Sequence, residues 1–324
     1  MVVSRSKQLT SLILLRGIAA FMVCLCHFGG ALTTEGVGNF SIFEFFHDYG
    51  LYGVHVFFVI SGFVIPLSLF RGKYRPSDYL TFLKKRFYRL HPPYLAALSF
   101  SLLLGYAALS IRGIPFPEDA LSIFKSIFYL HSPSFNPVFW TLRVEAEYYL
   151  LIGVLYIFYL KHPKTSVILG LPALILFSLI ESSSFKLLEY LPIFSVGIIS
   201  FLLYTNGWGK LYCTGMLAVT LFFISLYFPL PVVILIVLTL LAFLFFNRPL
   251  YFPFSYLGKI SYSLYLIHYP IGVKFINLTK VYFTHENYWV LLIITIILCV
   301  VSAAVFYSLF EKFSENWSRN LSYG

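Results

Sequence analysis

The sequence predicts an all-α polytopic membrane protein with about ten transmembrane helices. Of its 324 residues, 59% are hydrophobic and only 11% are charged, whereas soluble domains average about 25% charged residues. Apolar runs long enough to cross a hydrocarbon layer of about 30 Å recur along the whole chain, which predicts one integral-membrane domain over residues 1–324 with no appended soluble domain. The predicted spans are residues 12–31, 51–70, 93–112, 139–160, 165–181, 187–205, 211–228, 231–247, 257–278 and 288–310.

Ten spans leave both termini on one side of the membrane, and the basic residues predict that this side is the cytoplasm. Sixteen Lys and Arg residues fall on the terminal side of the spans and five on the other, with Arg16 and Arg143 counted as intramembrane. Cytoplasmic loops carry an excess of Lys and Arg, so the net charge of +10 indicates orientation in a membrane and not nucleic-acid binding. A cleaved signal peptide is disfavoured because Arg16 interrupts the first apolar run.

The first span carries two polar side chains, Arg16 and His27, separated by apolar or small residues. Eleven residues make about three helical turns, so both side chains lie on one face, about 16 Å apart along the axis. Ionisable groups within a membrane helix usually mark a pathway or a reaction site, although an arginine near a helix end also snorkels to the interface. The aligned pair favours a functional site. A metal site with Cys24 and Cys26 is not expected, because on a helix these two cysteines point in nearly opposite directions.

A basic amphipathic segment over residues 77–90 precedes the third span. The pair Pro92–Pro93 is expected to end its helix, and its broad apolar face with four basic side chains predicts a helix lying in the cytoplasmic interface. Two roles stay open for this helix. It anchors the chain to anionic lipid, or its Arg86 and Arg89 hold a polyanionic ligand close to Arg16.

The fourth span carries three charged side chains. Arg143 and Glu147 are four residues apart and are expected to form a structural ion pair. Glu145 points to another side of the helix and has no partner within the span. Because an unpaired carboxylate in or near a membrane is costly, Glu145 is expected to meet a buried histidine or arginine elsewhere in the bundle.

Two further stretches contribute candidate lining residues. Ser61 and Gly62 interrupt a bulky apolar run, which is typical of a close helix contact. His268 follows several Ser and Tyr hydroxyls in the ninth span, where a structural hydrogen-bonding role is favoured over catalysis. Candidate residues for the lining of a site are Ser61, Trp140, Tyr262 and His268.

Five stretches, taken together, resemble the bacterial transmembrane O-acyltransferases of acyltransferase family 3. The family's pattern of Arg, ten residues and His is matched by Arg16 and His27. Its other motifs are similar to GVHVFFVISGFVI (53–65), KKRFYRLHPP (84–93), WTLRVEAEYYLL (140–151) and LGKISYSLYLIH (257–268). The chain departs from the family at His55, where Asp is common, and at Ala146, which replaces the second Glu of the fourth-span motif.

The resemblance implies transfer of an acyl group, usually acetyl, from cytoplasmic acyl-CoA to a hydroxyl of a cell-envelope or exported glycan or a related acceptor, in the bacterial inner membrane. It implies that Arg16, Arg86 and Arg89 bind the CoA phosphates. His27 is expected to act as the general base, with Glu145 as its orienting partner. The pantetheine arm is expected along the first helix, past Gly17, Ala19 and Ala20.

The same resemblance sets the expected ligands and leaves the chemistry open between two routes. Acyl-CoA is the donor substrate, and no permanently bound cofactor and no metal are expected. The expected partners are the acceptor and membrane lipid, without nucleic acid, and a separate periplasmic transferase is a possible partner. Direct transfer to the acceptor and a transient acyl-histidine both remain open.

A transporter or flippase of small molecules or lipid-linked sugars is the main alternative, and a binding or scaffold protein is another. Transporters often show two similar halves with interrupted helices, and no such internal symmetry is visible in this sequence. Consumption of a thioester by the purified protein separates a transferase from a transporter. Loss of acyl-CoA binding on changing Arg16 argues against a scaffold.

Overall fold

The computed structural model describes residues 10–33, 41–182, 184–245 and 251–323, and throughout these ranges the regular structure is helical. The elements are α1 (Thr10–Leu32), α2 (Ile42–Gly50), α3 (Gly53–Arg71), α4 (Tyr79–Ile111), α5 (Ala120–Ile127), α6 (Trp140–Lys161), α7 (Pro163–Ile168), α8 (Gly170–Phe177), α9 (Leu187–Thr205), α10 (Lys210–Tyr227), α11 (Leu230–Phe245), α12 (Phe254–Lys259), α13 (Ser261–His268), α14 (Lys274–Thr279), α15 (Tyr288–Phe306) and α16 (Lys312–Asn320). The prediction of an all-α membrane protein is confirmed.

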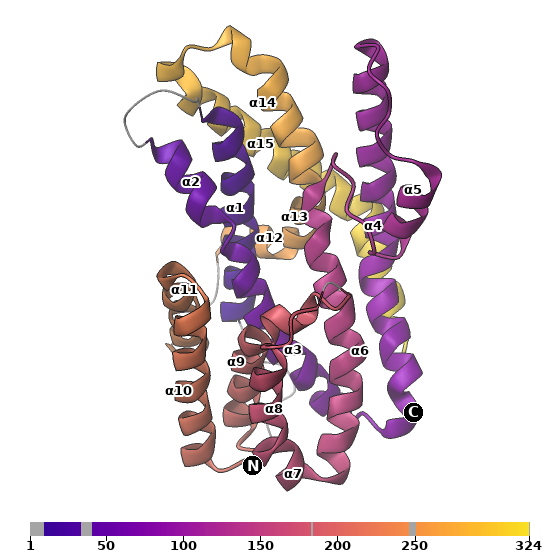
Figure 1. Ribbon diagram of the computed structural model, residues 1–324. Coiled ribbons are helices and arrows are strands. Elements are labelled where there is room, and N and C mark those ends of the chain that lie inside the picture. The colour runs from indigo at the N-terminus through magenta and orange to yellow at the C-terminus, as the bar shows by residue number, and fades with distance from the viewer. Residues whose placement is uncertain (1–9, 34–40, 183, 246–250, 324) are drawn as a thin grey trace.

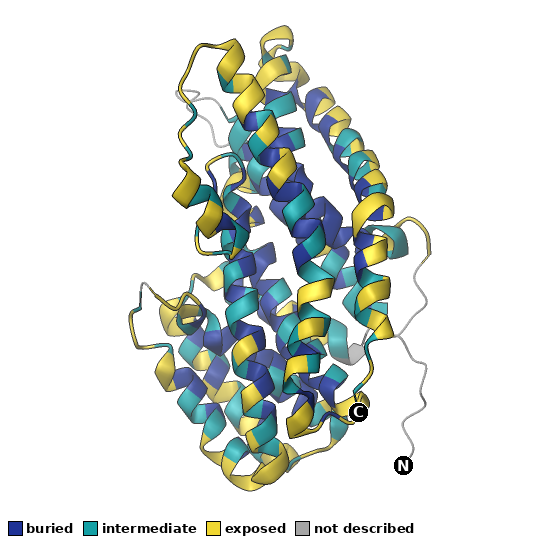
Figure 2. Cartoon of the chain, turned by 90° about the vertical axis from the view of Figure 1, so that its right-hand side faces the viewer, coloured by how far each residue is buried: buried dark blue, intermediate teal, exposed yellow. Residues whose placement is uncertain are grey.

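The helices form an elongated bundle, with α10 and α11 on one flank and α4 and α5 on the other (Figure 1). Helix α2 packs against α1, and α3 packs against both α1 and α9. Buried residues follow the centre of the bundle, and exposed residues gather at its ends and on its outer faces (Figure 2). On α15 the outer face is apolar, because its exposed side chains repeat every four residues. They include Trp289, Ile293, Ile297, Val301 and Val305, with Val290 and Ile294 exposed beside them, and this stripe suits contact with lipid.

Six helical stretches in the described residues are long and apolar enough to cross a membrane: Thr10–Leu32, Ile42–Arg71, Pro76–Ile111, Leu187–Thr205, Lys210–Tyr227 and His285–Asn320. The count of ten is therefore not confirmed. Four predicted spans are not among the six. The fourth, α6, carries several charged side chains, the fifth is divided into α7 and α8, the eighth, α11, is short, and the ninth is broken into α12, α13 and α14. The cytoplasmic position of both termini stays a prediction. Three of its basic residues, Arg5, Lys7 and Arg248, lie outside the described residues.

Small residues allow α3 and α9 to approach closely. A Cβ atom added to Gly62 would lie 2.2 Å from the carbonyl oxygen of Phe194, and one added to Gly197 would lie 2.2 Å from that of Val59. Both distances are far below van der Waals contact, so a larger side chain at either glycine would force the helices apart. The expected packing role of the Ser61–Gly62 stretch is confirmed for Gly62.

The expected helix end at Pro92–Pro93 is wrong, because α4 continues through both prolines. The predicted basic segment is therefore the first part of one helix of 33 residues. Proline has no N–H, so these two positions leave the carbonyls of Tyr88 and Arg89 without their helical donors. The hydroxyl of Ser314 on α16 donates to both carbonyls, at 3.4 Å to that of Arg89. A side chain from the far end of the chain thus satisfies the groups that would otherwise end the helix.

Candidate active site

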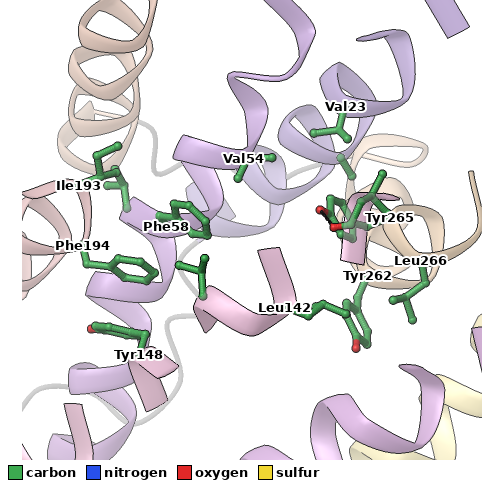
Figure 3. Packing of buried hydrophobic residues seen from close by; sticks show 14 of the residues in the cluster. Val23, Val54, Phe58, Leu142, Tyr148, Ile193, Phe194, Tyr262, Tyr265 and Leu266 are labelled. Atoms are coloured by element: carbon green, nitrogen blue, oxygen red, sulfur yellow. Dashed lines mark hydrogen bonds between the residues drawn. The ribbon is translucent and has the colours of Figure 1, made fainter. Parts of the chain in front are cut away.

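An inner cavity of about 120 Å³ lies among α1, α3, α4, α6 and α13. Its polar lining includes three guanidinium groups and one carboxylate, from Arg16, Arg86, Arg89 and Glu145, together with the hydroxyl of Ser61. Its apolar wall includes Phe58 and Leu142, with Tyr262 and Tyr265 on the other side of Leu142 in the close view (Figure 3). Thus the three arginines predicted from distant parts of the sequence converge on one cavity.

A larger outer cavity of about 610 Å³ adjoins the inner one, because Arg16 and Arg89 line both. Helices α12 and α16 complete its wall. The outer cavity collects five basic side chains against one carboxylate, those of Arg16, Arg89, Lys259, Lys312, Arg319 and Glu315. Such an excess of positive charge in a concave site attracts an anionic ligand. The two arginines therefore lie at the boundary between the outer and the inner cavity.

The three predicted arginines differ in what already holds them. Within the described residues Arg16 has no ion-pair or hydrogen-bond partner. Arg86 donates from Nη2 to the hydroxyl of Ser68 at 2.8 Å. Arg89 makes ion pairs with Glu311 at 2.9 Å and with Glu315 at 3.1 Å. The charge of Arg89 is therefore balanced by the protein. Among the described residues neither Arg16 nor Arg86 has an ion-pair partner, and Arg16 also lacks a hydrogen bond.

Glu311 is a buried acid that is not among the site residues predicted from the sequence. Its side chain is 0% exposed, and besides Arg89 it accepts hydrogen bonds from the backbone N–H of Ser263 at 3.0 Å and from the hydroxyl of Ser263 at 2.5 Å. This carboxylate therefore ties α4, α13 and the C-terminal part of the chain together beneath the cavity. The available signal was a single acid directly after the long apolar run of residues 288–310.

Glu145 lies at the level of Arg16 and not of His27. Its Oε1 accepts hydrogen bonds from the hydroxyl of Ser61 at 3.5 Å and from that of Tyr149. Helix α3 runs antiparallel to α1, with Val56 and Ile60 packed in one cluster with Ala19 and Leu15 of α1. Ser61 and its partner Glu145 are therefore about three turns of α1 away from His27.

The structure brings His27 instead to the histidine that ends α13. The ring centres of His27 and His268 are 5.4 Å apart, and the ring of Tyr269 is 5.1 Å from that of His27. Within the described residues no hydrogen bond joins Glu145 to His27. The ring of Tyr265, which lines the inner cavity, is 5.9 Å from that of His268. The ring of Tyr265 therefore lies between the inner cavity and His268.

The expected path of a ligand arm along α1 is wrong at Gly17. This glycine is buried against α12, and a Cβ added to it would lie 3.1 Å from the backbone nitrogen of Gly258. Ala19 and Ala20 are likewise 0% exposed. The space available to an arm lies on other elements, between α3, α6 and α13.

Trp140, expected as a lining residue, belongs to a separate cavity of about 480 Å³. The ring of Tyr190 packs against that of Trp140 at 5.6 Å, and the charged groups of Arg143, Lys186 and Glu189 complete much of the rim. The expected pair of Arg143 with Glu147 is present, at 2.9 Å. This third cavity combines flat aromatic surface with hydrogen-bonding groups. The other lining candidates, Ser61 and Tyr262, are in the inner cavity.

An all-α membrane protein with two adjoining polar cavities, and with a pair of histidines packed beyond the inner one, is a candidate membrane-embedded enzyme. The comparison with family models identifies the class of enzyme, because the acyltransferase domain of family 3 matches residues 9–308. The match covers most of the 324 residues, and the chain therefore belongs to this acyltransferase family. No curated protein and no solved structure matches the chain.

Proposed function

We propose that this acyltransferase takes its acyl group, most simply acetyl, from acyl-CoA and transfers it to a hydroxyl of a glycan or related envelope molecule in the bacterial inner membrane. The observation that carries the proposal is that Arg16 and Arg89 line both a basic outer cavity and the adjoining inner cavity. Acyl-CoA is anionic at one end and reactive at the other. A site for it needs positive charge outside and a base farther in.

The outer cavity suits the phosphates of the donor. Arginine binds phosphate through several N–H groups at once, and Arg16 has no competing partner within the described residues. Arg86 supplies a further guanidinium inside the inner cavity. We assign Arg89 mainly to holding this wall in place, since two carboxylates already balance its charge.

The chemical step is assigned to His27. Its imidazole takes the proton of the acceptor hydroxyl while the oxygen attacks the acyl carbon. The O–C bond forms, the C–S bond of the thioester breaks, and the proton returns to the leaving sulfur of CoA. A transient acyl-histidine, resolved by the same hydroxyl, gives the same products. Glu145 lies at the end of the inner cavity that is farther from His27. There its negative charge stabilises the positive charges of Arg16 and Arg86.

The third cavity supports an acceptor rich in hydroxyl groups. Aromatic faces such as those of Trp140 and Tyr190 pack against the apolar faces of sugar rings, and charged rim groups hydrogen-bond to hydroxyls. Its rim includes Lys186 and Glu189, which are exposed and available for such contacts.

The direct test is acyl transfer by the purified protein in nanodiscs supplied with acetyl-CoA and envelope glycan. Release of free CoA thiol and acetylation of the glycan, measured by mass spectrometry, are expected together. His27→Ala is expected to lower turnover by about 10²–10⁴-fold while still binding acetyl-CoA. His285→Ala, a matched histidine change in a short turn before α15, is expected to leave turnover unchanged. Movement of solute without thioester consumption, or turnover by His27→Ala within a few-fold of wild type, would contradict the proposal.

A further inference from the structure

The proton on His268 is fixed by the backbone of its own helix. His268 is 0% exposed, and its Nδ1 lies 3.1 Å from the carbonyl oxygen of Leu264 and 2.8 Å from that of Tyr265. A carbonyl oxygen only accepts hydrogen bonds, so Nδ1 must carry a proton to be satisfied. In the neutral ring Nε2 is then the nitrogen with the free lone pair.

This Nε2 atom is buried and has no hydrogen-bond partner among the described residues. A buried polar atom without a partner is costly and calls for an explanation. Three of the rings that pack against the His268 ring belong to Phe28, Tyr265 and His27. Phe28 has no donor, and the hydroxyl of Tyr265 is already within 2.8 Å of the carbonyl of Val138. Of these three neighbours, His27 is the one with an N–H free to donate.

The spacing of the two imidazoles suits a hydrogen bond between them. A ring nitrogen lies roughly 1.1 Å from the ring centre, so an N–H···N bond of about 3 Å joins rings whose centres are about 5.2 Å apart. The observed distance between the centres of His27 and His268 is 5.4 Å, with the rings inclined by 35°. The distance between the ring centres therefore allows this bond, provided that His27 turns a nitrogen toward Nε2 of His268.

The backbone around His268 is built to hold it in this place. A π-helical turn, Tyr269–Val273, follows it directly, and such turns are frequent at functional sites. Pro270 in that turn frees the carbonyl of Leu266, and the buried amide of Asn136 donates to this carbonyl at 2.8 Å. The irregular segment is thus supported by another part of the bundle.

We propose that Nε2 of His268 accepts a hydrogen bond from His27 and thereby positions His27 as the base of the acyl transfer. With one nitrogen of His27 donating to His268, the other holds its lone pair toward the acceptor hydroxyl. His268 acts through His27 because its own nitrogen is covered, whereas His27 is partly exposed. It is a positioning residue, and this role rests on the proposed function.

Two amide substitutions separate the two nitrogens of His268. His268→Asn keeps a donor near the position of Nδ1 for the carbonyls of Leu264 and Tyr265 but removes the acceptor at Nε2. His268→Gln places an amide oxygen near the position of Nε2. We expect kcat of His268→Asn to fall about tenfold or more, the value of one hydrogen bond, with KM for acetyl-CoA within twofold. His268→Gln is expected to recover kcat to within about threefold of wild type.

A second readout needs no acyl acceptor. Diethyl pyrocarbonate reacts with the unprotonated nitrogen of an accessible histidine, and mass spectrometry of the His27 peptide gives the rate. We expect His27 to react faster in wild type and in His268→Gln than in His268→Asn. If wild type transfers no acyl group but this order of reactivity is observed, the proposed function fails and the pairing of the histidines stands.

Two outcomes would overturn the pairing. One is that wild type and His268→Asn have equal kcat and equal His27 reactivity. The other is that His268→Asn and His268→Gln lose kcat equally while their thermal stability is unchanged. If His268→Asn does not fold, His268→Leu replaces it as the variant without an acceptor. Equal behaviour of His268→Leu and His268→Gln then refutes the role of Nε2.

Discussion

The buried ion pair between Arg89 and Glu311 predicts how much stability the protein loses when Arg89 is removed. Arg89→Ala leaves Glu311 with only the two hydrogen bonds from Ser263, in a site where the carboxylate is 0% exposed. Removal of one partner from a buried pair costs about 3–5 kcal/mol, because the other charge stays uncompensated. We expect a loss of this size in reversible unfolding in mixed detergent–SDS micelles.

Arg319 provides the matched control, because it pairs with Glu315 at 3.5 Å but is 75% exposed. Exposed pairs contribute about 0–1 kcal/mol, so Arg319→Ala should unfold nearly as wild type does. Adding Glu311→Gln to Arg89→Ala removes the uncompensated charge of the carboxylate. The double variant should therefore recover at least half of the lost unfolding free energy. Equal unfolding free energies for Arg89→Ala and Arg319→Ala, or no recovery in the double variant, would refute the assignment of a buried pair.

Three further changes test the site and the packing. Arg16→Ala should weaken acetyl-CoA binding about ten- to over a hundredfold in calorimetry, the value of a charged hydrogen bond, and unchanged affinity would indicate a snorkelling arginine. Ser314→Ala should cost about 1–3 kcal/mol in the same unfolding assay, because the carbonyl of Tyr88 loses its donor; wild-type stability would show that another group replaces the hydroxyl. Gly197→Ala should strongly reduce the yield of folded protein, since its Cβ would meet the carbonyl of Val59, whereas Gly215→Ala, with open space around it, should not.

What the sequence could predict depended on how far apart the interacting groups lie along the chain. The alignment of Arg16 with His27 needed only the period of one helix, and the family motifs placed Arg86 and Arg89 in the same site. Identifying the partner of His27 required the register between α1 and α13, which the sequence does not give. Glu145 fitted as a motif residue, but α3 and α6 hold it at the level of Arg16.

Errors in the helix boundaries have a similar cause. Two adjacent prolines predict a helix end when only local hydrogen bonds are counted. The donor that keeps α4 intact is Ser314, more than two hundred residues away. Helix α2 was missed because its nine residues are too few to signal a membrane span, and its role becomes visible only where Gly29 and Gly50 allow it to pack against α1.

The outer cavity is built partly by a stretch of chain beyond the part that defines the enzyme family. Lys312, Glu315 and Arg319 in its wall follow residue 308, where the family match ends, whereas His27 and His268 lie well within it. Helix α16 therefore supplies only part of the wall that would face the charged end of the proposed donor, because Arg16, Arg89 and Lys259 of the same wall lie within the family match. A chimaera that exchanges only α16, with its contacts to α4 retained, would alter which anionic carriers are admitted and leave the catalytic machinery untouched.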